Sequence, residues 1–441
     1  MTSPADSLKS FYRSLDDRAR LWLIAGAFML LNAVVWLVIF KLFWFGDKTI
    51  TDTPIYFDYA SRVVRGLFPY RDFSSEYPPL ALLFFILPRL LSGPDYGMFV
   101  WWFELEMLFF SFGIIAIITN VSWKLWRNLL RTAYAVASYT AFTLCLGSIV
   151  EARFDIAVAF LILASLACFV ADRSLAAWLL LGLGIMTKII PVLIAPLYII
   201  IHLRRRQHEE MWLGPLAMLI MAAIIATPFL VASADGLASS FLYHAERPLQ
   251  LESSWSSPLL ILSKLGYQVQ IMNSYGSHNV FASASDTLVL LSGLATMLVL
   301  ACVYWLFHRT LGNENDCGGA TGGGAADGGI SNGLFCFAAI SIAAFIFLGK
   351  VFSPQFLIWL LPLMALIRTR NQRLVTGLFA SVLLLTQWEF PYRYWELFLI
   401  EPDMVITVAL RNALLGLLVV VMIWSAGDLR RNVKLPAPAA V

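Results

Sequence analysis

Twelve apolar runs, separated by polar connections, follow one another along the 441 residues of the chain. A helix that spans a bilayer needs about 20 mostly apolar residues, so twelve spans would occupy roughly 240 positions. Hydrophobic residues make up 60% of the chain and charged residues only 13%, about half the charged share of a soluble domain. A soluble protein could not cover so large an apolar core with polar surface. The pattern predicts an all-α, polytopic transmembrane helical protein with about 12 spans.

Charged or polar residues set the limits of the runs. The runs cover about 22–44, 98–121, 132–150, 155–171, 175–187, 189–202, 211–232, 286–308, 333–349, 354–367, 374–388 and 404–425. A further apolar stretch, 78–93, is short and contains three prolines and Arg89. We predict a re-entrant or surface-lying helix there; a thirteenth span is the alternative.

Arginines and lysines concentrate in connections that the positive-inside rule places in the cytoplasm. Both termini are then cytoplasmic, and the outer loops collect acids, a histidine and further cations. We therefore expect a site on the extracytoplasmic side of a plasma or inner membrane. The predicted divisions are a cytoplasmic N-terminal segment (1–21), a transmembrane domain (22–425), a first extracytoplasmic loop with juxtamembrane helices (45–97), a large extracytoplasmic loop (233–285), a Gly-rich cytoplasmic linker (309–332) and a cytoplasmic tail (426–441).

Several classes of partner and site are excluded by composition. The formal net charge is +3 and basic residues form no stripe with interleaved aromatics, so we expect no nucleic-acid partner. The cysteines show neither CxxC nor Cys/His metal spacing, and we interpret them as inert thiols. They are Cys145, Cys168, Cys302, Cys317 and Cys336. The first apolar run is long enough to remain as an anchor, so we expect no cleaved signal peptide.

Two apolar runs are too short to cross a bilayer alone. The run 175–186 has twelve residues, and 189–201 has thirteen and is broken by two prolines. Short paired helices would place Lys188, which lies between them, at headgroup depth or deeper, where an ionisable residue is usually functional. No acid near Lys188 in the sequence neutralises it. The simpler alternative is a lysine that snorkels from a helix end.

The first outer loop, ITDTPIYFDYASRVVRGLFPYRDFSSEYPPL, mixes acids with arginines. Its candidate functional acids include Asp52, Asp58 and Glu76, and helical spacing over 54–65 indicates a helix lying along the membrane surface. A second outer turn, Glu151-Ala-Arg153-Phe-Asp155, places three charges in five residues. The alternatives are a solvated loop whose charges pair among themselves and simple anchoring of helix ends.

The large outer loop supplies another polar cluster, in the stretch YHAERPLQLES. Four of its polar residues fall within nine positions: His244, Arg247, Gln250 and Glu252. A zinc site would need more His or Cys ligands at suitable spacing, so we expect no metal there. The stretch GKVFSPQFLIWLLPL places Lys350 and Gln355 at the outer start of a later span.

One chemistry would use all of these groups. A carboxylate on an outer loop can act as a general base on a sugar hydroxyl. Cations at headgroup depth can hold a lipid phosphate and neutralise the charge that grows as it leaves. Suitable cations are Lys188, Arg153, Arg247 and Lys350. The sequence contains no phosphate-cradling glycine loop, which favours a lipid-phosphate donor over a nucleotide.

Six stretches carry a family resemblance: TDTPIYFDYA, GLFPYRDFSSEYPPL, RFDIAVAFLILA, LGLGIMTKIIPVLIAPL, YHAERPLQLES and KVFSPQFLIWLLPL. They run from about residue 50 to 365, and EYPPL, SPQ and HxxRxxQxES form the most specific combination. Together they resemble glycosyltransferase family 87, polyprenyl-phosphate-sugar-dependent membrane enzymes of the GT-C superfamily that include bacterial mannosyltransferases.

The resemblance implies an inverting transfer of a hexose, with mannose as first choice, or a pentose, from a polyprenyl-phosphate-linked donor to a glycolipid or polysaccharide hydroxyl. The family's catalytic acid follows the first span, which matches Asp52, with Asp58 as second choice. The residues expected to bind the donor phosphate are Lys188, Arg247, His244, Lys350 and Arg153. Those expected to bind sugar or acceptor are Glu76, Tyr77, Asp155, Gln250, Glu252 and Gln355. The resemblance implies no cofactor, and we expect no divalent metal.

Three other functions remain possible from the sequence alone. A lipid-linked sugar flippase or transporter would fit the broken helices at 175–201, but the chain shows no repeat that relates two halves. A polysaccharide polymerase or ligase would also face outward and would rely on arginines and a histidine in large outer loops. A scaffold without chemistry fits least well, because many unpaired charges gather on the outer face.

Overall fold

The computed structural model describes residues 14–46, 50–311 and 325–427. Most of the predicted N-terminal segment, linker and tail lies outside the described residues. Within them, seven helices are long and apolar enough to cross a membrane. They are α2 (Asp17–Leu37), α5 (Tyr96–Trp126), α6 (Leu129–Leu146), α10 (His208–Ala232), α13 (Ser285–Thr310), α14 (Ala325–Leu348) and α18 (Pro402–Gly427). The chain is a helical, multi-pass membrane protein.

The remaining predicted runs form shorter helices, some of which begin with a 3₁₀ turn. They are α7 (Asp155–Val170), α8 (Ser174–Thr187), η5 (Ile190–Ile194) with α9 (Ala195–Arg204), η7 (Pro354–Leu360) with α15 (Leu361–Leu366), and α16 (Gln372–Glu389). Pro191 and Pro354 stand at the start of η5 and η7, where a residue without an N–H is tolerated. In the described chain, helices occupy all twelve predicted positions. Only seven of these helices are long and apolar enough to cross a membrane by themselves. The number of twelve spans therefore stays a prediction.

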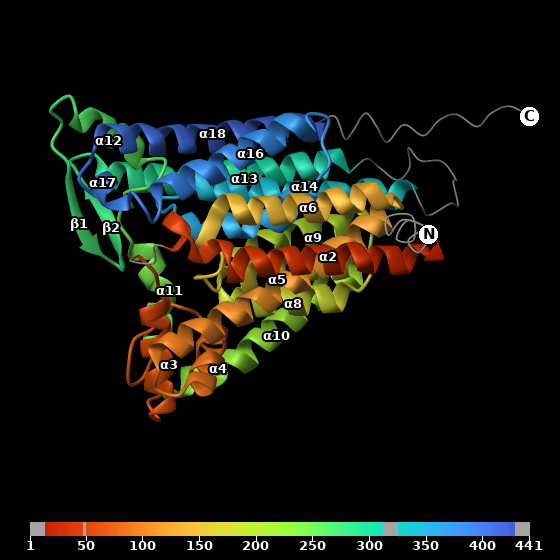
Figure 1. The fold of residues 1–441 in the computed structure, drawn as a ribbon, viewed down its shortest axis with the longest axis horizontal. Coiled ribbons are helices and arrows are strands. Elements are labelled where there is room, and N and C mark those ends of the chain that lie inside the picture. The colour runs from red at the N-terminus through yellow and green to blue at the C-terminus, as the bar shows by residue number, and fades with distance from the viewer. Residues whose placement is uncertain (1–13, 47–49, 312–324, 428–441) are drawn as a thin grey trace, which may run out of the picture.

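The long helices run roughly side by side along the molecule, and the connecting elements gather at its two ends (Figure 1). Helix α2 begins and α18 ends at the same end of this bundle. The opposite end carries the short elements. These are α3 (Thr53–Val64), α4 (Leu83–Ser92), α11 (Ala234–Glu246), α12 (Ser256–Ser263), α17 (Tyr394–Phe398) and the strands β1 (Gln270–Ser274) and β2 (Ser277–Phe281). The segments predicted to lie in the two largest outer loops therefore meet at one end.

Segment 45–97 contains α3 and α4, with the 3₁₀ turns η1 (Ile39–Lys41), η2 (Phe43–Gly46) and η3 (Pro79–Leu82) around them. Helix α4 packs against α5 and leaves Leu83, Leu87 and Leu90 exposed. An exposed leucine row on a short helix suits a membrane interface. The stretch 78–93 thus contains a short helix, which the proline-containing sequence predicts, with Phe85 and Pro88 buried on one side and the leucine row exposed on the other.

A two-stranded hairpin adds a small β element to the otherwise helical described chain. Strands β1 and β2 pair antiparallel, with Gln270 opposite Phe281 and Ser274 opposite Ser277. Tyr275 and Gly276 form the tip, with φ angles of 52° and 62°. Positive φ at both central residues is the mark of a two-residue type I′ turn, whose twist matches that of the strands.

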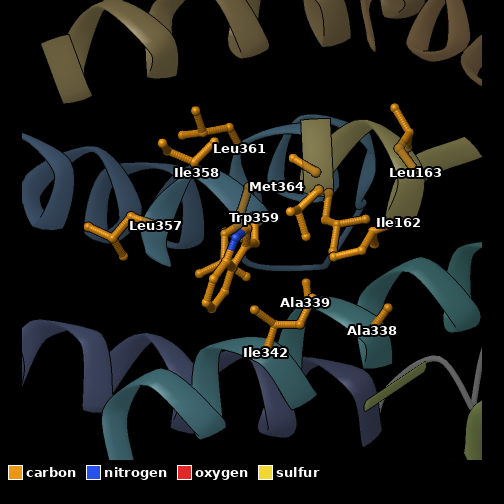
Figure 2. Close-up of a cluster of buried hydrophobic side chains, with 14 of the residues drawn as sticks. Ile162, Leu163, Ala338, Ala339, Ile342, Leu357, Ile358, Trp359, Leu361 and Met364 are labelled. Carbon is orange, nitrogen blue, oxygen red and sulfur yellow. The ribbon is translucent and has the colours of Figure 1, made fainter. Parts of the chain in front are cut away.

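The core is built around the central segments η7 and α15, which pack against α7 and α14 (Figure 2). Helix α7 is apolar on nearly all sides and lies largely buried, as expected for a helix surrounded by other helices. Trp359 of η7 is almost fully buried, and its Nε1 donates a hydrogen bond to Asp155 Oδ1 over 2.8 Å. This bond links the core directly to the polar end of the bundle.

Candidate active site

A cavity of about 720 Å³ is lined by segments from both predicted outer loops and by the ends of several helices. Most of the predicted site residues line it. These are Asp52, Glu76, Tyr77, Arg153, Lys188, His244, Arg247, Gln250, Glu252, Lys350 and Gln355. Residues spread over some 300 positions of sequence therefore share one space. Two predicted residues, Asp58 and Asp155, do not line it.

Asp52 stands immediately before α3 as its N-cap residue, yet its side chain makes no capping hydrogen bond. The carboxylate instead meets two groups across the cavity wall. Arg153 Nε lies 3.4 Å from Asp52 Oδ2, and the Tyr56 hydroxyl donates to the same oxygen over 3.4 Å. The Asp52 side chain remains 27% exposed. The carboxylate is therefore oriented by a cation and open to a ligand, which suits a proton acceptor.

Asp58 is placed differently. It lies one turn along α3, pairs with Arg62 over 2.8 Å and is 45% exposed outside the cavity lining. The spacing of four residues on one helix makes this pairing local. Asp58 as the alternative base is therefore a prediction that the structure does not support, because the helix turns its carboxylate away from the cavity.

Lys188 ends α8 and forms an ion pair that the sequence does not reveal. Its Nζ lies 2.7 Å from Oδ1 of Asp155, the first residue of α7, and that side chain is 0% exposed. A carboxylate at a helix N-terminus and an ammonium at a helix C-terminus both gain from the helix dipoles. Lys188 therefore has an acidic partner, although no acid lies near it in the sequence. The prediction of Asp155 as a sugar contact is not supported, because it lies beneath Lys188.

Aromatic rings surround the same ammonium group. Lys188 Nζ lies 4.9 Å from the ring centre of Phe154, 5.3 Å from Trp359 and 5.6 Å from Phe356. Cation–π contacts of this kind hold an ammonium in a fixed position with little water. Lys188 is thus a positioned cation at the cavity wall.

Arg247 and Lys350 supply further positive charge. Arg247 Nη2 donates to Ser277 Oγ over 2.8 Å, and Lys350 Nζ donates to the carbonyl of Ala245 over 2.6 Å. Neither contact is an ion pair. Partial burial, and then the nearby Arg247 guanidinium, lowers the pKa of Lys350. Among the described residues, neither cation has an ion-pair partner, so the two together form a favourable place for an anion.

His244 lies in the cavity but not as a cation. Its Nε2 contacts the carbonyl oxygen of Glu76 over 2.9 Å, so this nitrogen carries the proton and donates. Desolvation, and then the positive charge of Arg247, lowers the pKa of His244 to about 4. This hydrogen bond ties α11 to the first outer loop, and the role of His244 in binding the donor phosphate stays a prediction.

Gln250 and Glu252 form the polar floor of the cavity. Gln250 Nε2 donates to Glu252 Oε2 over 3.0 Å, and both side chains are almost fully buried. The other side-chain oxygen of each residue is buried without a hydrogen-bond partner among the described residues. Glu252 Oε1 lies 3.8 Å from Arg411 Nη1. Buried polar atoms are nearly always satisfied, so the unsatisfied oxygen of Gln250, a cavity-lining residue, indicates a place for a ligand with hydroxyl groups.

A family model described as Glycosyltransferase family 87 matches residues 76–320, more than half of the chain. The chain belongs to glycosyltransferase family 87. It is therefore a membrane glycosyltransferase. A comparison with curated protein sequences finds no match. Among solved structures, a crystal structure of ArnT from Cupriavidus metallidurans in the apo state is similar with a TM-score of 0.48 and 14% identity, over 94% of this chain and 78% of that chain.

Several cavity residues of this family 87 glycosyltransferase escape sequence reasoning. The hairpin contributes Tyr275 and His278, and α17 contributes Tyr394 and Trp395. His278 Nδ1 and the Tyr394 hydroxyl are hydrogen-bonded over 2.9 Å, although 116 residues separate them. The polar stretch NSYGSHN and the polar segment 389–403 are the only signals in the sequence, and neither reveals that the two segments meet.

One wall of the cavity is apolar and belongs to membrane-spanning helices. Val289, Gly293 and Thr296 of α13 line it together with Ile190 and Phe345. The cavity of the glycosyltransferase therefore joins a polar, cation-lined end to an apolar side. Among the described residues, no group of three or more His, Cys, Asp and Glu side chains is arranged to hold a metal ion.

Proposed function

We propose that this family 87 glycosyltransferase transfers a hexose, with mannose as first choice, from a polyprenyl-phosphate donor to a glycolipid or polysaccharide hydroxyl. The reaction would occur with inversion at the extracytoplasmic face of a bacterial plasma membrane. One observation carries the proposal: a carboxylate open to ligand, three cations and an apolar wall share one cavity. Each feature matches one part of the reaction.

The cations and the apolar wall support a lipid-phosphate donor. Arg247 and Lys350 would bind the phosphate directly, and Lys188, which is paired with Asp155, would add positive charge beside it. Together they would stabilise the anion that forms when the phosphate leaves. The surface of α13 offers Val289 and Gly293 to the same cavity, so an isoprenoid chain could leave toward the lipid without crossing the polar wall. A nucleotide donor would have no use for this apolar side.

Asp52 would act as the general base. The acceptor oxygen attacks the anomeric carbon as Asp52 takes the hydroxyl proton, and the bond between that carbon and the phosphate oxygen breaks. Its electron pair leaves with polyprenyl phosphate. Arg153 Nε, 3.4 Å from Asp52 Oδ2, would hold the carboxylate in one orientation. A single displacement inverts the anomeric configuration.

A membrane transfer assay tests the proposal. Membranes containing the wild-type protein, Asp52→Asn or Asp58→Asn are supplied with radiolabelled decaprenyl-phosphate-mannose, and label is followed into lipid and polymer fractions. We expect transfer by wild type and Asp58→Asn and loss in Asp52→Asn at equal protein amount. The labelled fraction identifies the acceptor class.

Two results would contradict parts of the proposal. Full transfer by Asp52→Asn would remove Asp52 as the base. If the wild type releases no label from this donor or from other lipid-phosphate sugars, then the lipid-phosphate donor is wrong. Movement of intact lipid-linked sugar across the bilayer under the same conditions would identify a transporter instead.

A further inference from the structure

A buried charged cluster lies directly behind Glu252. It consists of Glu252, Glu389 at the end of α16 and Arg411 within α18, whose side chains are 2%, 0% and 0% exposed. Arg411 Nη1 lies 3.4 Å from Glu389 Oε2 and 3.8 Å from Glu252 Oε1. Of the three, Glu252 lines the cavity. The cluster therefore connects α16 and α18 to the cavity.

The charges of the cluster do not balance if all three groups are ionised. Two carboxylates and one guanidinium leave one uncompensated negative charge away from water, which is strongly disfavoured. The other charged or titratable groups that face Glu252 are Arg153 and Tyr394. Arg153 already pairs with Asp52, and a tyrosine hydroxyl is neutral. One shared proton between the two carboxylates would remove the imbalance.

Several contacts favour Glu252 as the residue that holds this proton. Arg411 lies closer to Glu389, which leaves Glu389 as its charged partner. Gln250 Nε2 donates to Glu252 Oε2, as an amide does to a carboxyl carbonyl. Glu252 Oε1, 3.8 Å from Arg411 Nη1, accepts no hydrogen bond within the described structure, so it can carry a proton toward Glu389. Burial, and then the charge of Glu389, raises the pKa of Glu252 well above its usual range.

The same cluster fixes the backbone at position 252. Arg411 Nη2 and Asn412 Nδ2 both donate to the carbonyl oxygen of Glu252, over 2.6 and 3.2 Å. Asn412 Nδ2 also donates to Ser257 Oγ over 2.9 Å. These α18 residues lie outside the part of the chain that the family model matches. They hold the loop that carries Glu252 from behind, without lining the cavity themselves.

Glu252 lies near the residues that we propose to bind the donor phosphate. The backbone N–H of Gln250 donates to the carbonyl of Lys350 over 3.0 Å, so the floor of the cavity is tied to one of the donor-phosphate cations. Arg247 lies five residues before Glu252. A sugar attached to a phosphate held by Arg247 and Lys350 would rest against this floor.

We propose that Glu252 faces the cavity as a neutral carboxylic acid that hydrogen-bonds to a hydroxyl group of the donor sugar, with Glu389, Arg411 and Asn412 as positioning residues. This assignment rests on the proposed function for the identity of its ligand. The protonation state itself does not, because it follows from the cluster alone.

Infrared spectroscopy of the purified protein in detergent tests the protonation state without substrate. The wild-type minus Glu252→Gln difference spectrum at neutral pH should contain a carboxylic-acid C=O band, and Glu252→Asp should shift that band. Glu246→Gln, an exposed glutamate on α11, serves as the matched control and should give no such band. A featureless difference for Glu252→Gln, or a band shifted only by Glu389→Asp, would overturn the assignment.

Steady-state kinetics of transfer then test whether Glu252 hydrogen-bonds the donor sugar. Glutamine keeps a neutral hydrogen-bonding group, so Glu252→Gln should retain kcat/KM within about threefold, whereas Glu252→Ala should lose about tenfold, the effect of one neutral hydrogen bond. If Glu252→Gln and Glu252→Ala lose activity equally, Glu252 acts as a carboxylate and the proposal is wrong.

The positioning role of Asn412 has its own test. Asn412→Ala should raise KM for the donor with little change in kcat. An unchanged KM would mean that Asn412 is not a positioning residue. If the wild-type protein shows the infrared band but transfers no sugar, the proposed function is refuted while the protonation state of Glu252 stands.

Discussion

The ion pair between Lys188 and Asp155 gives a stability prediction that needs no substrate. Asp155→Asn would leave an unneutralised ammonium among three aromatic rings, and Lys188→Met would leave an unneutralised carboxylate that is 0% exposed. Each single change breaks a buried pair, whereas the double variant removes both charges. The three variants therefore separate the interaction of the two charges from the packing of their side chains.

The distance sets the expected magnitude. At 2.7 Å, two unit charges attract by about 6 kcal/mol at an effective dielectric constant of about 20. The desolvation of both groups offsets much of this attraction, and breaking a buried pair costs about 3–5 kcal/mol. Lys188 is 14% exposed, so we expect the lower limit, about 3 kcal/mol for each single variant. The double variant leaves no unpaired charge and should cost no more than about 3 kcal/mol, compared with about 6 kcal/mol if the two single costs added, so the coupling energy should be at least about 3 kcal/mol.

Denaturant unfolding of the purified protein in detergent micelles measures these differences. Asp172→Asn is the matched control, because Asp172 pairs with Arg205 over 3.2 Å while its side chain is 77% exposed. Exposed pairs contribute at most about 1 kcal/mol, so this variant should unfold nearly as the wild type does. If the costs of Asp155→Asn and Lys188→Met simply add in the double variant, the two charges do not stabilise each other and the reasoning is refuted.

Three further predictions concern the site and its frame. Asp52→Asn should lower transfer by about 10²–10⁴-fold, the usual contribution of a general base, with Asp58→Asn close to wild type in the same membrane assay. The pKa of His244 is lowered to about 4 from 6.5, so the unfolded chain binds its proton first as the pH falls. Thermal unfolding should therefore show stability lost between pH 6.5 and 4, and His244→Gln should reduce that loss. A Cβ at Gly236 would collide with the carbonyl oxygen of Tyr70, so Gly236→Ala should displace α11 and lower both transfer and the unfolding temperature.

Each of these three predictions would be contradicted by a specific experimental result. Equal activity losses in Asp52→Asn and Asp58→Asn would mean that the first outer loop acts through its overall charge. An identical pH dependence in wild type and His244→Gln would show that His244 titrates normally in the folded protein. Full activity and stability in Gly236→Ala would show that α11 is free to move away from the first outer loop.

Much of the site could be predicted from sequence because its residues stand next to long apolar runs. Asp52, Lys188 and Lys350 each lie at the end of such a run, where hydropathy alone locates a membrane boundary. His244, Arg247, Gln250 and Glu252 share one short stretch, and a polar cluster in a largely apolar chain is easily seen. The positive-inside rule places the loops that carry these residues on one face of the membrane, so the sequence also predicted that they lie close together.

The pairings could not be predicted in the same way. Lys188 and Asp155 are 33 positions apart, and Arg411 lies 159 positions from Glu252. An arginine within an apolar run gives no indication of which carboxylates it will meet. Asp58 and Asp52 differ by less than two helical turns, so sequence offers both as the base, and only the rotation of α3 points one of them into the cavity.

The sequence by itself determined that the chain is a multi-helix membrane protein of glycosyltransferase family 87, because apolar run length and local motifs are properties of contiguous residues. The tertiary structure decided which charged groups lie in ion pairs, as Lys188 and Asp58 do, and which line the cavity with no ion-pair partner among the described residues, as Arg247 and Lys350 do. That decision depends on helix packing. In a low-dielectric interior, a shift of a few ångströms determines whether two charges form a pair or remain available to a substrate.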